Sequence, residues 1–298
     1  MSTCPACSTA VSGPPIEKAA PPYHFLRCEG CDLVFTDPMP SVDGEWYRRQ
    51  QMYLVRDTVA KPKLQWNHRQ FLKDLPAHGG RLLDVGCGTG EFLAAASAAG
   101  YETFGFDFDA EAVKTAQEQF GLKNIFSGDL WSFAAGENAG QFDVVTAFEV
   151  LEHSPTPGEF AADLAKLVRP GGFLAVSVPN RERRPRFQYD WDFPPNHLSR
   201  WNKECLAGIL RRNGFRILRT ANGWRQGESF LHQHLQFGLV TRLLRGGKKS
   251  ESVALASSAY WLKSTAIRCL AVPLNVGLGL IGETGMTLYV LAKKNDGR

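Results

Sequence analysis

The chain has 298 residues, which is enough for one or two domains with a sizeable core. Hydrophobic residues make up 44% of it and charged residues 21%, as in an ordinary globular protein, and the net charge of +4 does not by itself indicate a nucleic-acid partner. The most apolar stretch, residues 269–282, contains Pro273 and three glycines. A membrane-spanning helix needs about 20 apolar residues, so we predict no transmembrane segment.

The cysteine content points to a reducing compartment. Seven cysteines are an odd number, and no charged leader followed by an apolar core is visible near the start of the chain. We therefore expect a cytoplasmic protein without a disulfide framework.

Two C-x-x-C pairs stand near the N-terminus: Cys4 with Cys7, and Cys28 with Cys31. Each pair can place two thiolates on one tight turn, and the 20 residues between the pairs match the spacing of a zinc ribbon. Four thiolates leave no open position on the metal, so the predicted role is structural. A redox dithiol or two unrelated surface pairs are the alternatives. We assign residues 1–40 to this ribbon and residues 41–79 to a helical connector or lid.

From residue 80 onward, short apolar strands alternate with amphipathic helices. The predicted strands are 81–85, 102–106, 124–127, 142–147 and 173–178, and the predicted helices are 91–99, 111–120 and 158–168. This order predicts an α/β fold, a doubly wound and mostly parallel sheet that binds ligands at the carboxyl ends of its strands.

The first strand leads into a glycine-rich turn that contains Gly86, Gly88 and Gly90. Glycine lets the backbone turn sharply and approach a ligand closely. Asp107 ends the second strand, where an acid can bind a ribose diol. Asp129 follows the third strand, and its alternative role is that of a plain turn residue.

The C-terminal third completes the sheet. We predict a helix at 202–213, a strand at 215–220 and a last strand at 286–292. Residues 222–285 are too long for a hairpin loop and are predicted to form a helical insertion. Its apolar and basic residues suit a peripheral membrane contact, with a substrate lid or a dimer contact as alternatives.

The motif D-V-G-C-G-T-G at residues 84–90 resembles the first motif of class I S-adenosylmethionine-dependent methyltransferases. Residues 105–107, 128–129, 149–153 and 167–172 resemble the later motifs of that family, in order. The resemblance covers about half of the chain. It implies the seven-stranded class I methyltransferase fold for residues 80–298, with the last strand antiparallel beside the sixth, and S-adenosylmethionine as cofactor.

The same resemblance implies roles for individual residues. The glycines would line the methionine and ribose, Asp107 would hold the ribose hydroxyls, and Asp129 the adenine amino group. Phe148 would border the sulfonium. The full set implied to contact the cofactor is Asp84, Gly86, Cys87, Gly88, Gly90, Asp107, Phe108, Asp129, Leu130 and Phe148.

Residues 28–40 resemble the entry of bacterial methyltransferases that carry a zinc ribbon, many of which act on sugars, polysaccharide precursors or other small metabolites. The leading hypothesis is therefore methyl transfer to oxygen or carbon of a small molecule or glycan precursor. The oligomeric state and the acceptor stay open.

Three side chains could carry the chemistry: Glu152, His153 and His197. In one interpretation a histidine is a general base. In another, these residues and Glu149 bind a second, divalent metal, which resembles the E-x-x-E-H plus distal histidine of small-RNA 2′-O-methyltransferases and some quinone O-methyltransferases. In a third, the histidines only hold a loop.

Arg181–Arg186 is a basic run near the same edge of the predicted sheet. It could bind phosphate groups of RNA or of a nucleotide sugar, or form a solvated loop. An RNA methyltransferase that uses this run and the ribbon is therefore the second hypothesis. A non-catalytic cofactor-binding scaffold is the third.

Overall fold

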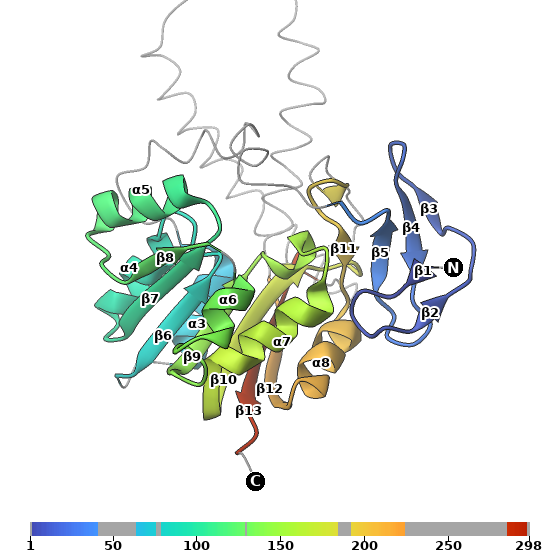
Figure 1. Cartoon of the computed structure of the whole chain (residues 1–298). Coiled ribbons are helices and arrows are strands. Elements are labelled where there is room, and N and C mark those ends of the chain that lie inside the picture. The colour runs from blue at the N-terminus through green and yellow to red at the C-terminus, as the bar shows by residue number, and fades with distance from the viewer. Residues whose placement is uncertain are drawn as a thin grey trace, which may run out of the picture. The chain divides into compact units, whose positions relative to one another are not determined.

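The computed structural model describes residues 2–40, 64–75, 79–128, 130–183, 192–223 and 285–296 (Figure 1). These fall almost entirely into one compact unit, made of residues 1–181, 188–221 and 287–298. A second unit comprises residues 182–187 and 222–286. The predicted insertion at 222–285 and most of the connector at 41–79 lie outside the described residues.

A seven-stranded sheet forms the centre of the first unit (Figure 1). In sheet order its strands are β12 (Phe215–Asn222), β13 (Thr287–Lys294), β10 (Val168–Pro179), β9 (Phe142–Phe148), β6 (Arg81–Val85), β7 (Glu102–Asp107) and β8 (Ile125–Ser127). The strands from β10 to β8 are parallel, and β13 runs antiparallel to β10 between it and β12. The predicted doubly wound sheet is confirmed.

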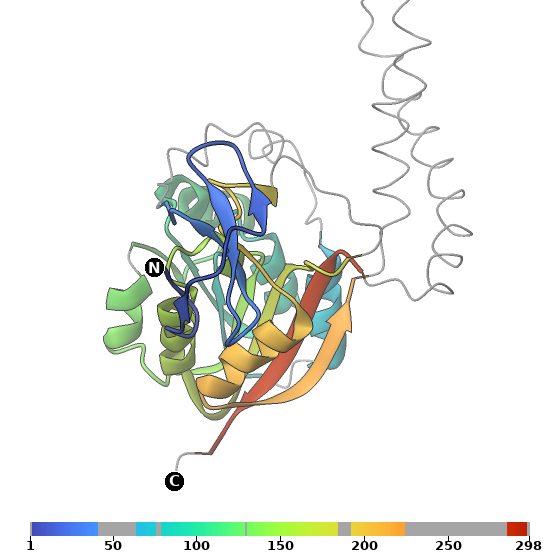
Figure 2. The same cartoon turned by 90° about the vertical axis from the view of Figure 1, so that its right-hand side faces the viewer.

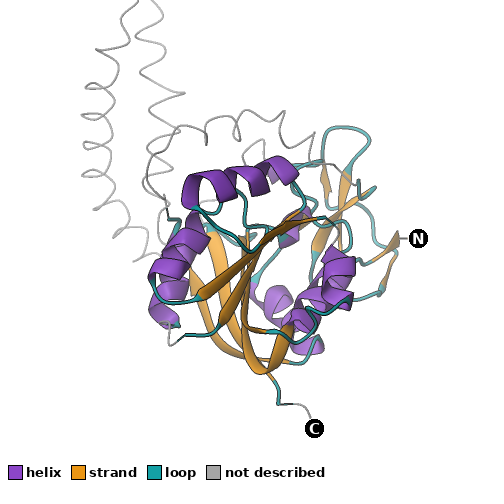
Figure 3. Ribbon diagram, turned by 60° about the vertical axis from the view of Figure 1, so that its left-hand side comes forward, coloured by secondary structure: helices purple, strands orange, loops and turns teal. Residues whose placement is uncertain are grey.

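Helices cover both faces of this sheet (Figure 3). They are α3 (Trp66–Asp74), α4 (Glu91–Ala98), α5 (Ala110–Phe120), α6 (Leu130–Ala135), α7 (Pro157–Leu167) and α8 (Lys203–Arg212). One apolar cluster joins the sheet to α3, α4 and α5, and another joins it to α6, α7 and α8. α5 begins where the Asp109 side chain accepts a hydrogen bond from Glu111 N and ends at Gly121, whose φ of 64° favours glycine.

Two local predictions differ from the structure. α6 was not predicted, because six residues are too few to show a helical period. The predicted helix at 158–168 is α7, which ends at Leu167, and the following R-P-G-G residues lie within β10. The pairing of β10 with β9 shifts register between Val168 and Phe173, so these residues form an irregularity of the strand.

Residues 2–40, which we call the N-terminal ribbon, supply three strands of a four-stranded sheet. The order of this sheet is β11-β5-β4-β3. Three of its strands are β3 (Glu17–Lys18), β4 (His24–Arg27) and β5 (Val34–Asp37), and a separate hairpin pairs β1 (Ser2–Thr3) with β2 (Ala10–Val11). The fourth strand, β11 (Ser199–Arg200), comes from the chain that follows β10 and lies beside β5 (Figures 1 and 2). Among the described residues, no helix is long and apolar enough to cross a membrane.

Candidate functional site

The glycine-rich turn between β6 and α4 requires glycine for two separate reasons. Gly86, Gly88 and Gly90 have φ values of 78°, 52° and 84°, which side chains rarely adopt. A Cβ on Gly86 would also lie 2.3 Å from the side chain of Val150, and one on Gly90 would lie 2.7 Å from Leu122. The turn therefore presents bare backbone at the carboxyl edge of the sheet.

Asp107 lies at the end of β7 and is tied to this turn. Its Oδ2 accepts a hydrogen bond from Gly88 N at 2.8 Å, and its Oδ1 accepts one from Asp109 N at 2.9 Å. The residue is buried, whereas the next residue, Phe108, is half exposed. A carboxylate at the end of this strand can accept hydrogen bonds from ribose hydroxyls.

Asp84 lies in β6 just before the turn, and Cys87 is part of the turn. Asp84 is buried and accepts a hydrogen bond from Thr146 Oγ1 at 2.6 Å. Burial raises the pKa of Asp84 to about 7, and the charge of Asp107 adds to this rise. Burial also raises the pKa of the Cys87 thiol, so this sulfur stays protonated at neutral pH.

Phe148, at the end of β9, packs in an aromatic group that the sequence did not predict. Its ring centroid lies 5.2 Å from that of Phe92 and 5.4 Å from that of His68. His68 belongs to α3, and Phe71 of the same helix is fully buried against these rings. Leu130 begins α6. Asp129 lies outside the described residues.

The structure brings together Glu152, His153 and His197, whose candidate ligand atoms all lie within 4.8 Å of one another. Glu152 Oε1 is 3.8 Å from His153 Nε2 and 4.0 Å from His197 Nε2. Glu149 is not part of this group, and its Oε1 accepts a hydrogen bond from Ser177 Oγ at 2.8 Å. The predicted four-residue set is therefore reduced to three.

A backbone carbonyl fixes the tautomer of His153. Its Nδ1 lies 2.7 Å from the carbonyl oxygen of Asn196, which can only accept, so Nδ1 carries the hydrogen. The lone pair of Nε2 therefore faces Glu152. His197 Nδ1 lies 3.5 Å from Asp192 Oδ1, a second partner that the sequence did not reveal.

The carboxylate of Glu152 is fully buried, and neither oxygen has a hydrogen-bond partner within the described part of the chain. Burial raises its pKa, and the charges of Glu149 and Asp192 raise it further. A buried carboxylate that faces lone pairs is costly unless a proton or a cation lies between them.

Burial also lowers the pKa of His153 to about 3; His197 adds to this, and the bond to Asn196 opposes it. An imidazole that is so hard to protonate is a weak proton acceptor at neutral pH. Its fixed tautomer is instead the one that metal-ligating histidines adopt.

The four ribbon cysteines also meet. Cys4 Sγ lies 3.6 Å from Cys31 Sγ, and Cys7 Sγ lies 3.5 Å from Cys28 Sγ. Tetrahedral zinc with Zn–S bonds of about 2.3 Å requires sulfurs about 3.8 Å apart, which fits this cluster. Cys205 of α8, which the sequence did not single out, is buried, and its hydrogen bond to Cys31 lowers the pKa of the Cys31 thiol.

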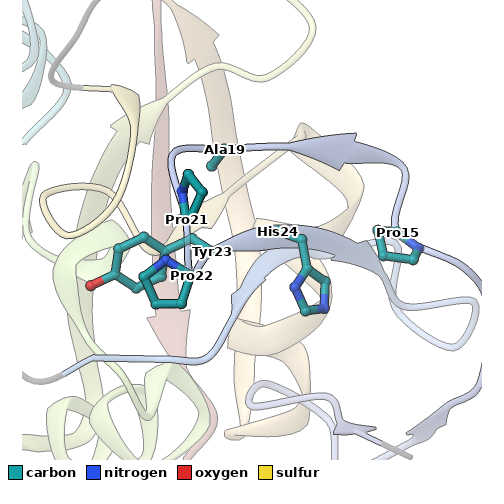
Figure 4. A pocket seen from close by; sticks show the side chains of 6 residues that line it. All are labelled: Pro15, Ala19, Pro21, Pro22, Tyr23 and His24. Atoms are coloured by element: carbon teal, nitrogen blue, oxygen red, sulfur yellow. The ribbon is translucent and has the colours of Figure 1, made fainter.

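A hollow in the ribbon and the contact of Arg181 with the ribbon are not part of the candidate active site. A hollow of about 320 Å³ is lined by Pro15, Ala19, Pro21, Pro22, Tyr23 and His24 (Figure 4), and none of these was a candidate residue. Arg181 was a candidate phosphate ligand, but its guanidinium donates to Asp32 Oδ2 at 2.5 Å. Arg181 therefore forms an ion pair with Asp32 inside the protein. Residues 184–186 of the basic run lie outside the described residues.

Known proteins resemble this chain in both sequence and fold. The model of a methyltransferase-domain family matches residues 47–220. A ubiquinone biosynthesis O-methyltransferase from Bordetella avium is 31% identical over 155 residues, or 50% of this chain and 62% of that protein. One from Methylococcus capsulatus is 32% identical over 165 residues, or 47% of this chain and 70% of that protein.

Among solved structures, an S-adenosylmethionine-dependent methyltransferase from Archaeoglobus fulgidus has a TM-score of 0.50 at 20% identity, covering 76% of this chain and 92% of that one. Phosphoethanolamine N-methyltransferase 2 from Haemonchus contortus has a TM-score of 0.55 at 17% identity, covering 89% and 63%. These likenesses show the fold alone. With the family match over more than half of its length, the chain belongs to the class I S-adenosylmethionine-dependent methyltransferases.

Proposed function

We propose that the protein transfers a methyl group from S-adenosylmethionine to an oxygen atom of a small molecule. The sequence relatives that carry O-methyltransferase names support the reaction class. The observation that carries the proposal is the buried carboxylate of Glu152, which accepts no hydrogen bond from the described residues and faces the Nε2 atoms of two histidines. An acceptor hydroxyl needs such a site, because it must be oriented and must lose its proton.

The residues around the turn fit the cofactor, which when bound supplies an electrophilic methyl group. The glycines at 86, 88 and 90 let the backbone approach the methionine closely. Asp107 binds the ribose hydroxyls, Phe108 and Leu130 flank the adenine, and Phe148 borders the sulfonium. Asp129 retains its proposed contact to the adenine amino group.

Glu152, His153 and His197 bind a divalent metal ion. Ligand atoms bound about 2.1 Å from one ion lie about 3 to 4.2 Å apart, and the distances of 3.8 and 4.0 Å fall in this range. Such an ion lowers the pKa of a bound hydroxyl and orients its oxygen. The main alternative is that His197 acts as a general base with Glu152 protonated.

The four cysteines of the N-terminal ribbon hold a structural zinc ion. Their sulfur separations support this role, and the closed set of four leaves no position for a substrate. A segment of about 40 residues needs a metal or a neighbour to remain folded.

The test is methyl transfer from isotopically labelled S-adenosylmethionine into a host extract, separated afterwards into small-molecule, polysaccharide-lipid, nucleic-acid and protein pools. Label in the small-molecule pool that Asp107→Ala abolishes supports the proposal, and label in the polysaccharide-lipid pool would assign a glycan precursor. Label in RNA would favour the RNA hypothesis. Retained binding of S-adenosylhomocysteine without label in any pool would favour a non-catalytic scaffold.

A second arm separates metal from base. The small-molecule reaction is repeated after treatment with a chelator and again after addition of Mn²⁺. Activity that disappears and then returns supports the metal site. Activity that is indifferent to metal but lost in His197→Gln supports the general base.

A further inference from the structure

The two residues that follow Leu198 belong to the sheet of the N-terminal ribbon. β11 pairs antiparallel with β5, with Ser199 opposite Phe35 and Arg200 opposite Val34 (Figure 2). β5 in turn pairs with β4. The turn between β4 and β5 carries Cys28 and Cys31, so two of the four clustered cysteines lie in a turn of the sheet that β11 joins.

Leu198 is the point where ribbon and candidate active site meet. Its N–H donates to the carbonyl of Glu152 at 2.8 Å, and its carbonyl accepts from Thr36 N at 2.9 Å. The residue is fully buried. The backbone next to His197 is therefore fixed on one side by the cluster and on the other by β5.

Two side chains strengthen this connection. Arg200 Nη1 donates to Glu17 Oε2 at 2.7 Å, and the guanidinium lies 3.7 Å from the centroid of the Phe25 ring. Only 13% of the Arg200 side chain is exposed, so water screens this ion pair weakly. Asn202 Nδ2 donates to Asp32 Oδ2 at 2.6 Å, directly after the second C-x-x-C pair.

We propose that the N-terminal ribbon positions His197. The ribbon's metal stiffens the β4–β5 hairpin, and β5 holds the backbone of His197 at the distance that the cluster requires. Arg200 is thus a positioning residue. This inference rests on the proposed function of the cluster. Gly88 and Asp107, which bind the cofactor in that proposal, lie at the ends of β6 and β7, and none of these ribbon contacts involves them.

The experiment compares Arg200→Glu with the charge-swapped double variant Arg200→Glu, Glu17→Arg. The ring resonances of ¹³C-labelled histidines, assigned through His197→Gln, report the position of His197, and hydrogen exchange reports the Leu198 amide. In Arg200→Glu we expect the His197 resonances to shift and exchange at Leu198 to rise by about tenfold or more. Affinity for S-adenosylhomocysteine should remain within about twofold, and the double variant should restore both signals.

Cys28→Ser, which removes one ribbon thiolate and leaves Glu152, His153 and His197 unaltered, should reproduce the Arg200→Glu signals. Arg169→Met is the matched control, since Arg169 pairs with Asp143 at the opposite end of β9. Unchanged His197 resonances in both Arg200→Glu and Cys28→Ser would overturn the inference. So would a loss of S-adenosylhomocysteine binding that parallels the change at His197, because it would mean general unfolding.

These readouts are independent of turnover. If the extract assay finds no methyl transfer but Arg200→Glu still moves His197, the proposed function fails and the positioning role stands. If methyl transfer is found while Arg200→Glu and Cys28→Ser leave His197 in place, the positioning role fails alone.

Discussion

The carboxylate of Asp107 accepts a hydrogen bond from the backbone N–H of Gly88 at 2.8 Å, so the acid at the end of β7 and the turn after β6 form one rigid unit. Asp107→Asn keeps the shape of the side chain but removes its charge. We expect affinity for S-adenosylhomocysteine to fall by about 10- to 100-fold, the effect of losing one or two charge-assisted hydrogen bonds. Isothermal titration calorimetry measures it. Glu118→Gln, on the exposed face of α5, is the control, and an unaltered affinity in Asp107→Asn would exclude the assigned role.

Alanine substitutions at Gly86 and Gly121 distinguish the cost of backbone strain from the cost of steric overlap. Both have positive φ, but a Cβ at Gly121 meets open space, whereas one at Gly86 would overlap Val150. Gly121→Ala should lower the free energy of unfolding by about 1 kcal/mol through strain alone. Gly86→Ala should cost about 2 kcal/mol more, because the side chain of Val150 must move. Urea unfolding followed by circular dichroism would measure both, and equal losses would refute the overlap at Val150.

Asp84 should make stability depend on pH. Its pKa is about 7 in the folded protein against an ordinary value of 3.8, so within this range the folded protein binds the extra proton. Stability is therefore greatest below this window and falls as the pH rises through it, by up to about 4 kcal/mol. Asp84→Asn keeps an acceptor for Thr146 and should remove that fall. Parallel stability profiles for the two proteins between pH 4 and 8 would contradict this assignment.

Glu152→Gln should affect stability and metal binding in opposite directions. The amide removes a buried negative charge to which the described part of the chain donates no hydrogen bond, so the metal-free variant should unfold at the same or a higher temperature than the wild type. Its affinity for Mn²⁺, measured by electron paramagnetic resonance, should fall by about 10-fold or more, since one ligand is lost. His24→Asn, in the ribbon, should change neither quantity. Full Mn²⁺ affinity in Glu152→Gln would rule out Glu152 as a ligand.

The ribbon cysteines should bind one zinc ion per chain with high affinity. Cobalt substitution should give the absorption bands of a tetrahedral thiolate complex, and Cys28→Ser should weaken them and lower the melting temperature. Cys87→Ser provides a comparison, because Cys87 is buried in the apolar cluster around α4 and is not one of the four clustered thiols. A purified protein that contains no zinc and binds no cobalt would disprove the four-cysteine zinc site.

Local sequence signals predicted the sheet well, because each strand between residues 81 and 179 is rich in apolar residues and has a glycine, an acid or a proline at its last position or directly after it. The sequence also proposed Glu152, His153 and His197 as one site, and the structure brings them together. The separation of Glu149 was not predictable, because it depends on the hydroxyl of Ser177 on the neighbouring strand.

Contacts made by backbone atoms or by very short strands were also beyond sequence reasoning. The tautomer of His153 depends on the carbonyl of Asn196, and any residue type supplies a carbonyl. β11 has only two residues, Ser199 and Arg200, which is too few to show the alternation that identifies a strand. Its partner strand lies far away in the sequence, so no local sequence pattern predicts the pairing.

That pairing also sets an order of events during synthesis. Ser199 pairs with Phe35, so this edge of β5 stays open until Ser199 has left the ribosome. During that interval Val34 and Phe35, both buried in the finished protein, lie on an unpaired strand edge that can join other chains. Closing so long a loop is entropically costly, which makes completion of the ribbon a late and slow event in folding.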